Sequence, residues 1–275
     1  MRTHRSLGII FLTVLPLLLI GCGTPRMVNR PQVNDVNKVA VVSVAATRGI
    51  HPVEGESKVG QMSALASMAS DEGDESGPFG GHTLVNEAVG IFTAELDKVK
   101  GWTAVSASEF TDSEAYDDFV QDIESGESSA PGLVRSLGTA NFIHAEGMPL
   151  VIYTSKEQRV RAGELAQALG VDAVAVTYLD VAYEASTSIG GTGTAAAAVG
   201  ADLVLINSDG KVAATTRNYR DADARFREPS KETTGMAAGE IAYNEKVEDM
   251  FLSSIQKTAA EVRRHLNTDL KKTAQ

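Results

Sequence analysis

Few residues in this chain of 275 could perform chemistry, and they are widely spaced. Cys22 is the only cysteine, so an intrachain disulfide, thiolate catalysis elsewhere in the chain and a Cys-rich metal site are all excluded. Neither His-Glu-x-x-His nor Gly-x-Ser-x-Gly occurs. We therefore expect no catalytic residue, no metal ligand and no cofactor, and we expect the protein not to be an enzyme. The histidines beyond Cys22 are His51, His82, His144 and His265.

Three segments superficially match known binding motifs. The glycine-rich stretch 77–83 precedes a helical pattern but lacks the lysine of a P-loop, so we interpret it as an entry loop. Residues 190–193 (GGTG) precede a strand pattern rather than the helix of a dinucleotide-binding fingerprint, which indicates a hairpin tip. The acidic run 71–75 lacks the spacing of a calcium-binding EF-hand loop, and we interpret it as a solvated loop.

One alternative keeps an enzymatic reading open. His144-Ala145-Glu146 has the His-x-Glu spacing of zinc deaminases, but that chemistry also needs a Pro-Cys-x-x-Cys segment, which the chain lacks. His51, His82 and His144 lie in or beside two long inserts, at 46–82 and 106–153. We expect scattered surface histidines, and the alternative is a hydrolase or metalloenzyme built from insert residues.

The start of the chain predicts export. Arg2 and Arg5 precede an almost wholly apolar run from Leu7 to Ile20, which is shorter than the roughly 20 residues of a membrane-spanning helix and typical of a signal peptide. The run ends in Leu19-Ile20-Gly21-Cys22, which resembles the lipobox of bacterial lipoproteins. The resemblance implies a signal peptide over residues 1–21 and lipidation, including palmitate, on Cys22. Gly23 follows the cysteine, which by the same resemblance favours the outer membrane, facing the periplasm.

The charge of the chain limits its partners. Removal of residues 1–21 leaves 23 basic residues against 36 acidic ones, a formal charge of −13. An acidic surface repels phosphate backbones, so we expect no nucleic acid partner. It also disfavours electrostatic docking on anionic lipid, so the lipid on Cys22 must hold the protein to the membrane.

The hydrophobic pattern predicts one α/β domain over residues 38–267. Residues 22–37 are polar, contain two prolines and are interpreted as a flexible tether that could span roughly 50 Å. Residues 268–275 are interpreted as a polar tail. The predicted elements are a strand at 38–45, a helix at 83–100, a strand at 102–105, a helix at 156–169, a strand at 171–180, two further strands at 195–207 and 211–218 that complete an antiparallel meander, and a long helix at 236–266.

This order predicts a mixed sheet with helices packed on it, β-α-β-(insert)-α-β-β-β-α. The stretch 164–176 (ELAQALGVDAVAV), with its helix ending in Leu-Gly-x-Asp before a strand, is similar to the periplasmic domains of curli-secretion-type lipoproteins, of lipoprotein activators of penicillin-binding proteins, and to the N-terminal domain of TolB. The resemblance covers about half of the chain after residue 21. It implies a TolB-N-like fold and a non-catalytic role in assembly or partner binding.

We therefore expect an envelope lipoprotein whose domain binds an envelope protein partner, with a second copy of the chain as an additional candidate partner. A subunit of an outer-membrane secretion pore is a further alternative, although residues 195–200 (AAAAVG) lack the alternation of a lipid-facing strand. If the first two strands are parallel, the inserts at 46–82 and 106–153 leave the same edge of the sheet. Binding crevices of open α/β sheets lie at that edge, so we expect the partner site there.

Overall fold

The computed structural model describes residues 27–28, 30–47, 51–52, 83–125, 142–189, 192–217, 234–237, 240–241 and 245–271. Cys22 and the segments 71–75 and 77–82 lie outside these residues. The elements are β1 (Met27–Val28), α1 (Arg30–Asn34), β2 (Lys38–Thr47), β3 (His51–Pro52), α3 (Thr83–Asp97), β4 (Thr103–Val105), the 3-10 helix η2 (Ala107–Glu109), α4 (Glu114–Ser125), β5 (Phe142–His144), α6 (Lys156–Ala168), β6 (Ala173–Ile189), β7 (Thr192–Asn207), β8 (Val212–Arg217), β9 (Thr234–Ala237), β10 (Glu240–Ile241) and α7 (Glu245–Lys271).

The predicted mixed sheet with packed helices is confirmed. Its main path of strands runs β1-β8-β7-β6-β2-β4, while β3, β5, β9 and β10 pair beside this path. Strand β2 is parallel to both β4 and β6, and β6, β7 and β8 form the predicted antiparallel meander. The β-α-β unit of β2, α3 and β4 is therefore as the sequence predicts.

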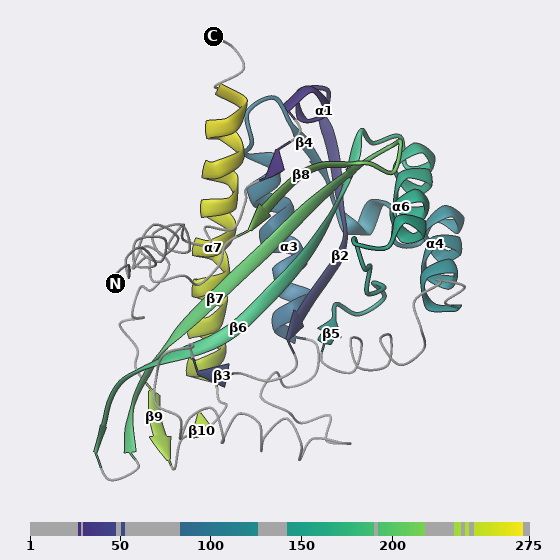
Figure 1. The fold of residues 1–275 in the computed structure, drawn as a ribbon. Coiled ribbons are helices and arrows are strands. Elements are labelled where there is room, and N and C mark those ends of the chain that lie inside the picture. The colour runs from purple at the N-terminus through teal and green to yellow at the C-terminus, as the bar shows by residue number, and fades with distance from the viewer. Residues whose placement is uncertain are drawn as a thin grey trace, which may run out of the picture.

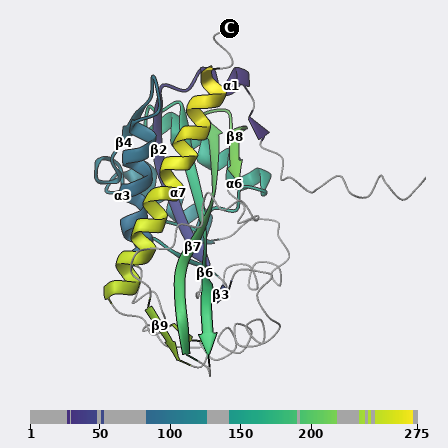
Figure 2. The same ribbon diagram turned by 90° about the vertical axis from the view of Figure 1, so that its left-hand side faces the viewer.

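Apolar residues cover both faces of the central strands. Val39, Val42 and Val44 of β2 have no exposed surface, because helices lie on either side of the sheet. Helices α3 and α7 pack together on one face, while α6 and α4 lie on the other (Figures 1 and 2). The stripe predicted on the first long helix is buried at Leu84, Ala88, Phe92 and Leu96.

Side-chain hydroxyls complete two gaps in the strand ladders. Strand β2 pairs with β4 over Lys38–Ala40 and with β5 over Ala45–Thr47, and between these the Tyr116 hydroxyl donates to the Val42 carbonyl over 3.0 Å. A buried backbone carbonyl without a partner would destabilise the fold, so this contact fixes α4 against the sheet. The part of the insert that runs from 106 to 125 thus belongs to the core, in which Phe110, Tyr116, Phe119 and Ile123 are buried.

The second gap lies on β7. Strand β8 pairs with Asp202–Ile206 and β9 with Thr192–Ala195, and in the described part of the chain no strand pairs with residues 196–201 on that side. Here α7 supplies the partners. The Ser254 hydroxyl accepts from the Val199 N–H over 3.3 Å, and the Thr258 hydroxyl donates to the Val199 carbonyl over 2.9 Å.

Several predicted boundaries are corrected. The segment 22–37 is not wholly a flexible tether: β1 pairs with β8, and Val33 and Val36 are buried in the core. Strand β2 continues to Thr47, and β3 pairs with β6 inside the insert 46–82, whose residues 53–82 lie outside the described part. The first two meander strands, β6 and β7, are longer than predicted, whereas β8 is two residues shorter than the predicted 211–218.

The C-terminal boundaries also differ. The last helix begins at Glu245, since residues 234–241 include two short strands, and it extends to Lys271 into the predicted polar tail.

Candidate functional site

A chain segment without regular structure crosses the sheet beside the carboxyl end of β2. It follows β5 and runs through Ala145 to Ser155, on the same side of the sheet as α6. The buried Ser43 hydroxyl fixes its middle by donating to the Pro149 carbonyl over 2.8 Å and accepting from the Val151 N–H over 3.5 Å. Both capacities of this hydroxyl are used within the fold, so Ser43 is a structural residue rather than a nucleophile.

Three aromatic rings meet where this segment passes over β6. The ring centroid of Tyr178 lies 6.2 Å from that of Phe142, in an edge-to-face arrangement, and 5.8 Å from that of Tyr153. The Tyr178 hydroxyl donates to the Val151 carbonyl and accepts from the Tyr153 N–H. We call Phe142, Tyr153 and Tyr178 the aromatic edge.

The N-terminal turn of α6 holds the aromatic edge in place. The buried Gln158 side chain accepts from the Ile152 N–H over 2.5 Å. The Arg159 guanidinium donates to the carbonyls of Tyr153 and Thr154, over 2.7 and 3.2 Å. Ser155 caps the same helix by accepting from the Gln158 N–H. The side chains of Gln158 and Arg159 therefore fix the backbone around Tyr153 by hydrogen bonds.

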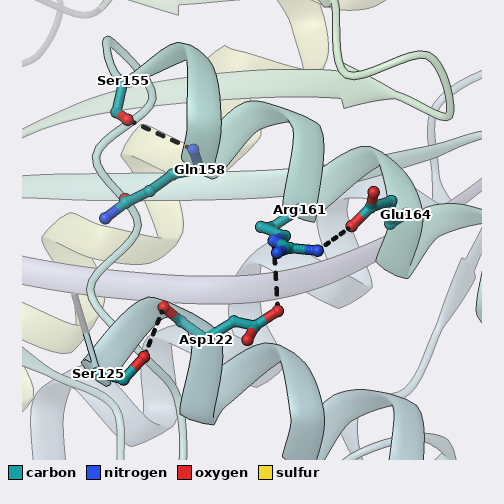
Figure 3. A network of polar contacts seen from close by, with 6 residues as sticks. All are labelled: Asp122, Ser125, Ser155, Gln158, Arg161 and Glu164. Atoms are coloured by element: carbon teal, nitrogen blue, oxygen red, sulfur yellow. Dashed lines mark hydrogen bonds and ion pairs between the residues drawn. The ribbon is translucent and has the colours of Figure 1, made fainter. Parts of the chain in front are cut away.

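A surface ion pair joins α6 to α4 (Figure 3). Arg161 lies 3.3 Å from the Asp122 carboxylate and 2.9 Å from that of Glu164, and the hydrogen bond to Glu164, followed by the charge of Asp122, raises the pKa of the Arg161 guanidinium. All three side chains are about half exposed, so the network orients the two helices and contributes little stability.

The opposite end of the segment is tied to the first turn of α3. The Asn86 side chain accepts from the Glu146 N–H over 2.8 Å, and the Ala145 N–H donates to the Val44 carbonyl over 2.9 Å. Strand β5, which lies within the 106–153 insert, pairs with Ala45–Thr47 at the carboxyl end of β2.

The aromatic edge offers mostly apolar contacts. Burial raises the pKa of the Tyr178 phenol well above its ordinary value, so the group stays neutral and cannot act as a base near neutral pH. The side chains that remain partly exposed are mostly apolar. Aromatic residues on a rigid backbone are typical of the energetically dominant positions in protein interfaces. The partly exposed set is Phe142, Ile143, His144, Leu150, Ile152, Tyr153 and Tyr178.

The described histidines lie on three separate elements of the fold. His144 lies in β5, with its Nδ1 atom 3.3 Å from the Ala145 carbonyl oxygen. His265 lies on α7, 3.8 Å from Glu261, and His51 pairs with Ala182 in the backbone of β3. His82 is outside the described residues. Within the part of the chain that the structure describes, no three His, Cys, Asp or Glu residues are grouped to hold a metal ion.

The other sequence motifs have structural roles where they are described. Strand β6 ends at Ile189, which pairs with Thr192 at the start of β7, so the interpretation of 190–193 as a hairpin tip is confirmed. Thr83 begins α3, while the rest of the 77–83 stretch lies outside the described residues. Among the helices that the structure describes, none combines the length and apolar character needed to cross a membrane.

Sequence reasoning missed the aromatic edge. Tyr178 lies in the strand predicted at 171–180, whereas Phe142 and Tyr153 lie in the insert 106–153, and nothing in their spacing along the chain links the three residues. A weak signal is present in the sequence: aromatic residues make up only 5% of the chain, and two of them, Phe142 and Tyr153, lie near each other in the insert 106–153.

Comparison with known proteins finds similarity to a solved structure but to no family. No protein-family model matches the chain, and no curated protein matches it. The chain is similar to the crystal structure of lipoprotein GNA1162 from Neisseria meningitidis at 16% sequence identity, over 82% of this chain and 99% of that one, with a TM-score of 0.21. The function is therefore argued from this chain's own residues.

Proposed function

We propose that this chain is an envelope lipoprotein, anchored through lipid on Cys22, whose α/β domain binds a protein partner at the aromatic edge. The observation that carries the proposal is the rigid, partly exposed set of Phe142, Tyr153 and Tyr178. Its backbone is held by Ser43, Gln158 and Arg159, so little conformational freedom is lost on binding.

The placement of the edge agrees with this role. It lies at the carboxyl end of β2, where β5 pairs with Ala45–Thr47. Polar groups around it are engaged in structural hydrogen bonds, which suits a binding surface better than a catalytic one. The outer membrane, facing the periplasm, is the location we propose, on the basis of Gly23 after Cys22.

The anchor is tested by Cys22→Ala. We expect loss of palmitate labelling and an uncleaved or soluble product, measured by metabolic labelling and fractionation of envelopes. Full membrane retention of a cleaved, unlipidated domain would contradict the lipoprotein assignment.

The binding site is tested by photocrosslinking in intact envelopes. A photoreactive phenylalanine analogue at Phe142 should form a discrete crosslinked product, whereas the same analogue at the exposed Gln256 of α7 should not. Tyr153→Ala should reduce the Phe142 product while leaving the amount of lipidated protein unchanged. Identical crosslinking patterns from the two positions would refute the aromatic edge as the binding site.

A further inference from the structure

The segment between the lipid and the domain is much shorter than its sequence suggests. If residues 22–37 were all flexible, they would span roughly 50 Å and the domain could turn freely above the membrane. In the structure β1 pairs with β8, with Met27 opposite Thr215 and Val28 opposite Ala214. Only five residue steps separate Cys22 from Met27, a reach of at most about 18 Å.

The docking of this segment continues beyond β1. Helix α1 contacts β8 and α7, and Val33 and Val36 are 2% and 3% exposed within the main core. Undocking the segment would expose both valines to water, which is unfavourable because each is an almost fully buried apolar side chain. The short reach is therefore a property of the folded domain.

The lipid leaves the domain from one edge of the sheet. Strand β1 is at one end of the main strand path and β4 at the other, and Figure 2 shows β8 and α1 on one side and β4 on the other. Five strand spacings separate the two edges, about 24 Å. A reach of about 18 Å cannot carry Cys22 around the domain to the opposite edge.

Charged residues are distributed unequally between the N-terminal segment and helix α4. Residues 22–34, which include β1 and α1, carry two basic residues, Arg26 and Arg30, and no acidic one. Helix α4, which is tied to β2 through Tyr116, has five acidic residues and no basic one. An anionic lipid surface attracts the first group and repels the second, even though the chain as a whole is acidic.

We propose that the β1–α1 edge of the domain faces the lipid bilayer and that α4 faces away from it. This edge of the domain contacts the bilayer, and the bilayer that it contacts carries anionic headgroups. The inference rests on the proposed lipidation of Cys22, and it adds a fixed orientation to the anchor.

The test uses the full-length lipidated protein in vesicles of phosphatidylcholine and phosphatidylglycerol that contain a headgroup-labelled acceptor lipid. Because the lipid consumes Cys22, an engineered cysteine is the only free thiol and can carry a fluorophore. One variant is Asn34→Cys on α1 and the other Asp118→Cys on α4, both at exposed positions. We expect stronger energy transfer to the lipid from position 34 than from position 118.

A linker variant is the matched control. About twelve Gly/Ser residues inserted between Thr24 and Pro25 lengthen the reach beyond the width of the domain and leave β1 in place. The difference in energy transfer between positions 34 and 118 should then become smaller. Equal transfer in the original protein, or stronger transfer from position 118, would overturn the orientation.

Flotation of the protein with the vesicles separates a failure of the proposed anchor from a failure of the proposed orientation. Protein that fails to float with the vesicles and incorporates no lipid contradicts the proposed anchor. Protein that floats but shows equal transfer from both labels contradicts only the orientation.

Discussion

Lys38 and Asp172 exchange hydrogen bonds in both directions. The Lys38 N–H donates to the Asp172 carboxylate over 2.9 Å, and the Asp172 N–H donates to the Lys38 carbonyl over 2.9 Å. The same carboxylate oxygen also accepts from the Asn37 N–H over 2.8 Å. These contacts join the start of β2 to the start of β6.

This relationship gives the Leu-Gly-x-Asp motif a structural meaning. Gly170 adopts a φ of +61°, a left-handed conformation that ends α6, and the N–H groups of Gly170 and Val171 donate to carbonyls of the last helical turn. Two residues later, Asp172 reaches the start of β2. The motif therefore couples a helix end to a strand start and by itself implies no activity.

Asp172→Ala should destabilise the domain by about 1–2 kcal/mol, because two backbone N–H groups lose a charged acceptor and water replaces it only in part. The measurement is the free energy of unfolding in urea. Asp209→Ala is the control, since its ion pair with Lys211 is more than 60% exposed and should contribute less than about 0.5 kcal/mol. Equal losses in the two variants would contradict the role of Asp172.

Gly163→Ala should destabilise the domain by about 1–3 kcal/mol. A Cβ at Gly163 of α6 would lie 2.5 Å from the backbone nitrogen of Gly210 in the turn between β7 and β8. Gly90→Ala is the matched helical control, because no atom lies within 4 Å of its added Cβ. That control should stabilise α3 by about 0.5–1 kcal/mol through helix propensity. Opposite signs in thermal unfolding are the expected result, and two stabilising changes would show that α6 does not pack closely on the turn.

Two buried threonines should respond in opposite ways to replacement by valine. Thr258→Val removes the hydrogen bond to the Val199 carbonyl and should cost about 1–2 kcal/mol. The Thr177 hydroxyl is buried and has no hydrogen-bond partner in the described structure, so Thr177→Val should be neutral or stabilising by about 1 kcal/mol. Denaturant unfolding of both variants measures the difference. A Thr258→Val protein as stable as the parent would mean that α7 does not complete the ladder of β7.

Stability should fall in alkaline solution because of two buried phenols. Burial raises the pKa of Tyr116 and of Tyr178 above the unfolded value of about 10. Because the folded state binds these protons more tightly, their contribution is complete below pH about 10 and is lost as the pH rises further. The free energy of unfolding, measured at pH 8 and about 11, should fall less steeply in the Tyr116→Phe, Tyr178→Phe double variant. Identical slopes would show that neither phenol is held neutral by the fold.

Local patterns along the chain determine much of this fold. The stripe from Leu84 to Leu96 predicts α3 because apolar residues at helical spacing must face a core. The apolar run at the start of β2 and the hairpin glycines near 190–193 likewise predict strands and a turn from neighbouring residues alone. Lipidation of Cys22 is predicted in the same way, because the motif that resembles a lipobox consists of the adjacent residues Leu19-Ile20-Gly21-Cys22.

Tertiary structure alone decided the rest, because it depends on contacts between residues far apart in the chain. Polar residues and prolines at 22–37 look like a tether, and only pairing with β8 and burial of Val33 dock that segment. The local sequence around Tyr116 does not indicate that its hydroxyl donates to the Val42 carbonyl, 74 residues away. Phe142, Tyr153 and Tyr178 share no local pattern, and they become one surface only where β5, the crossing segment and β6 meet.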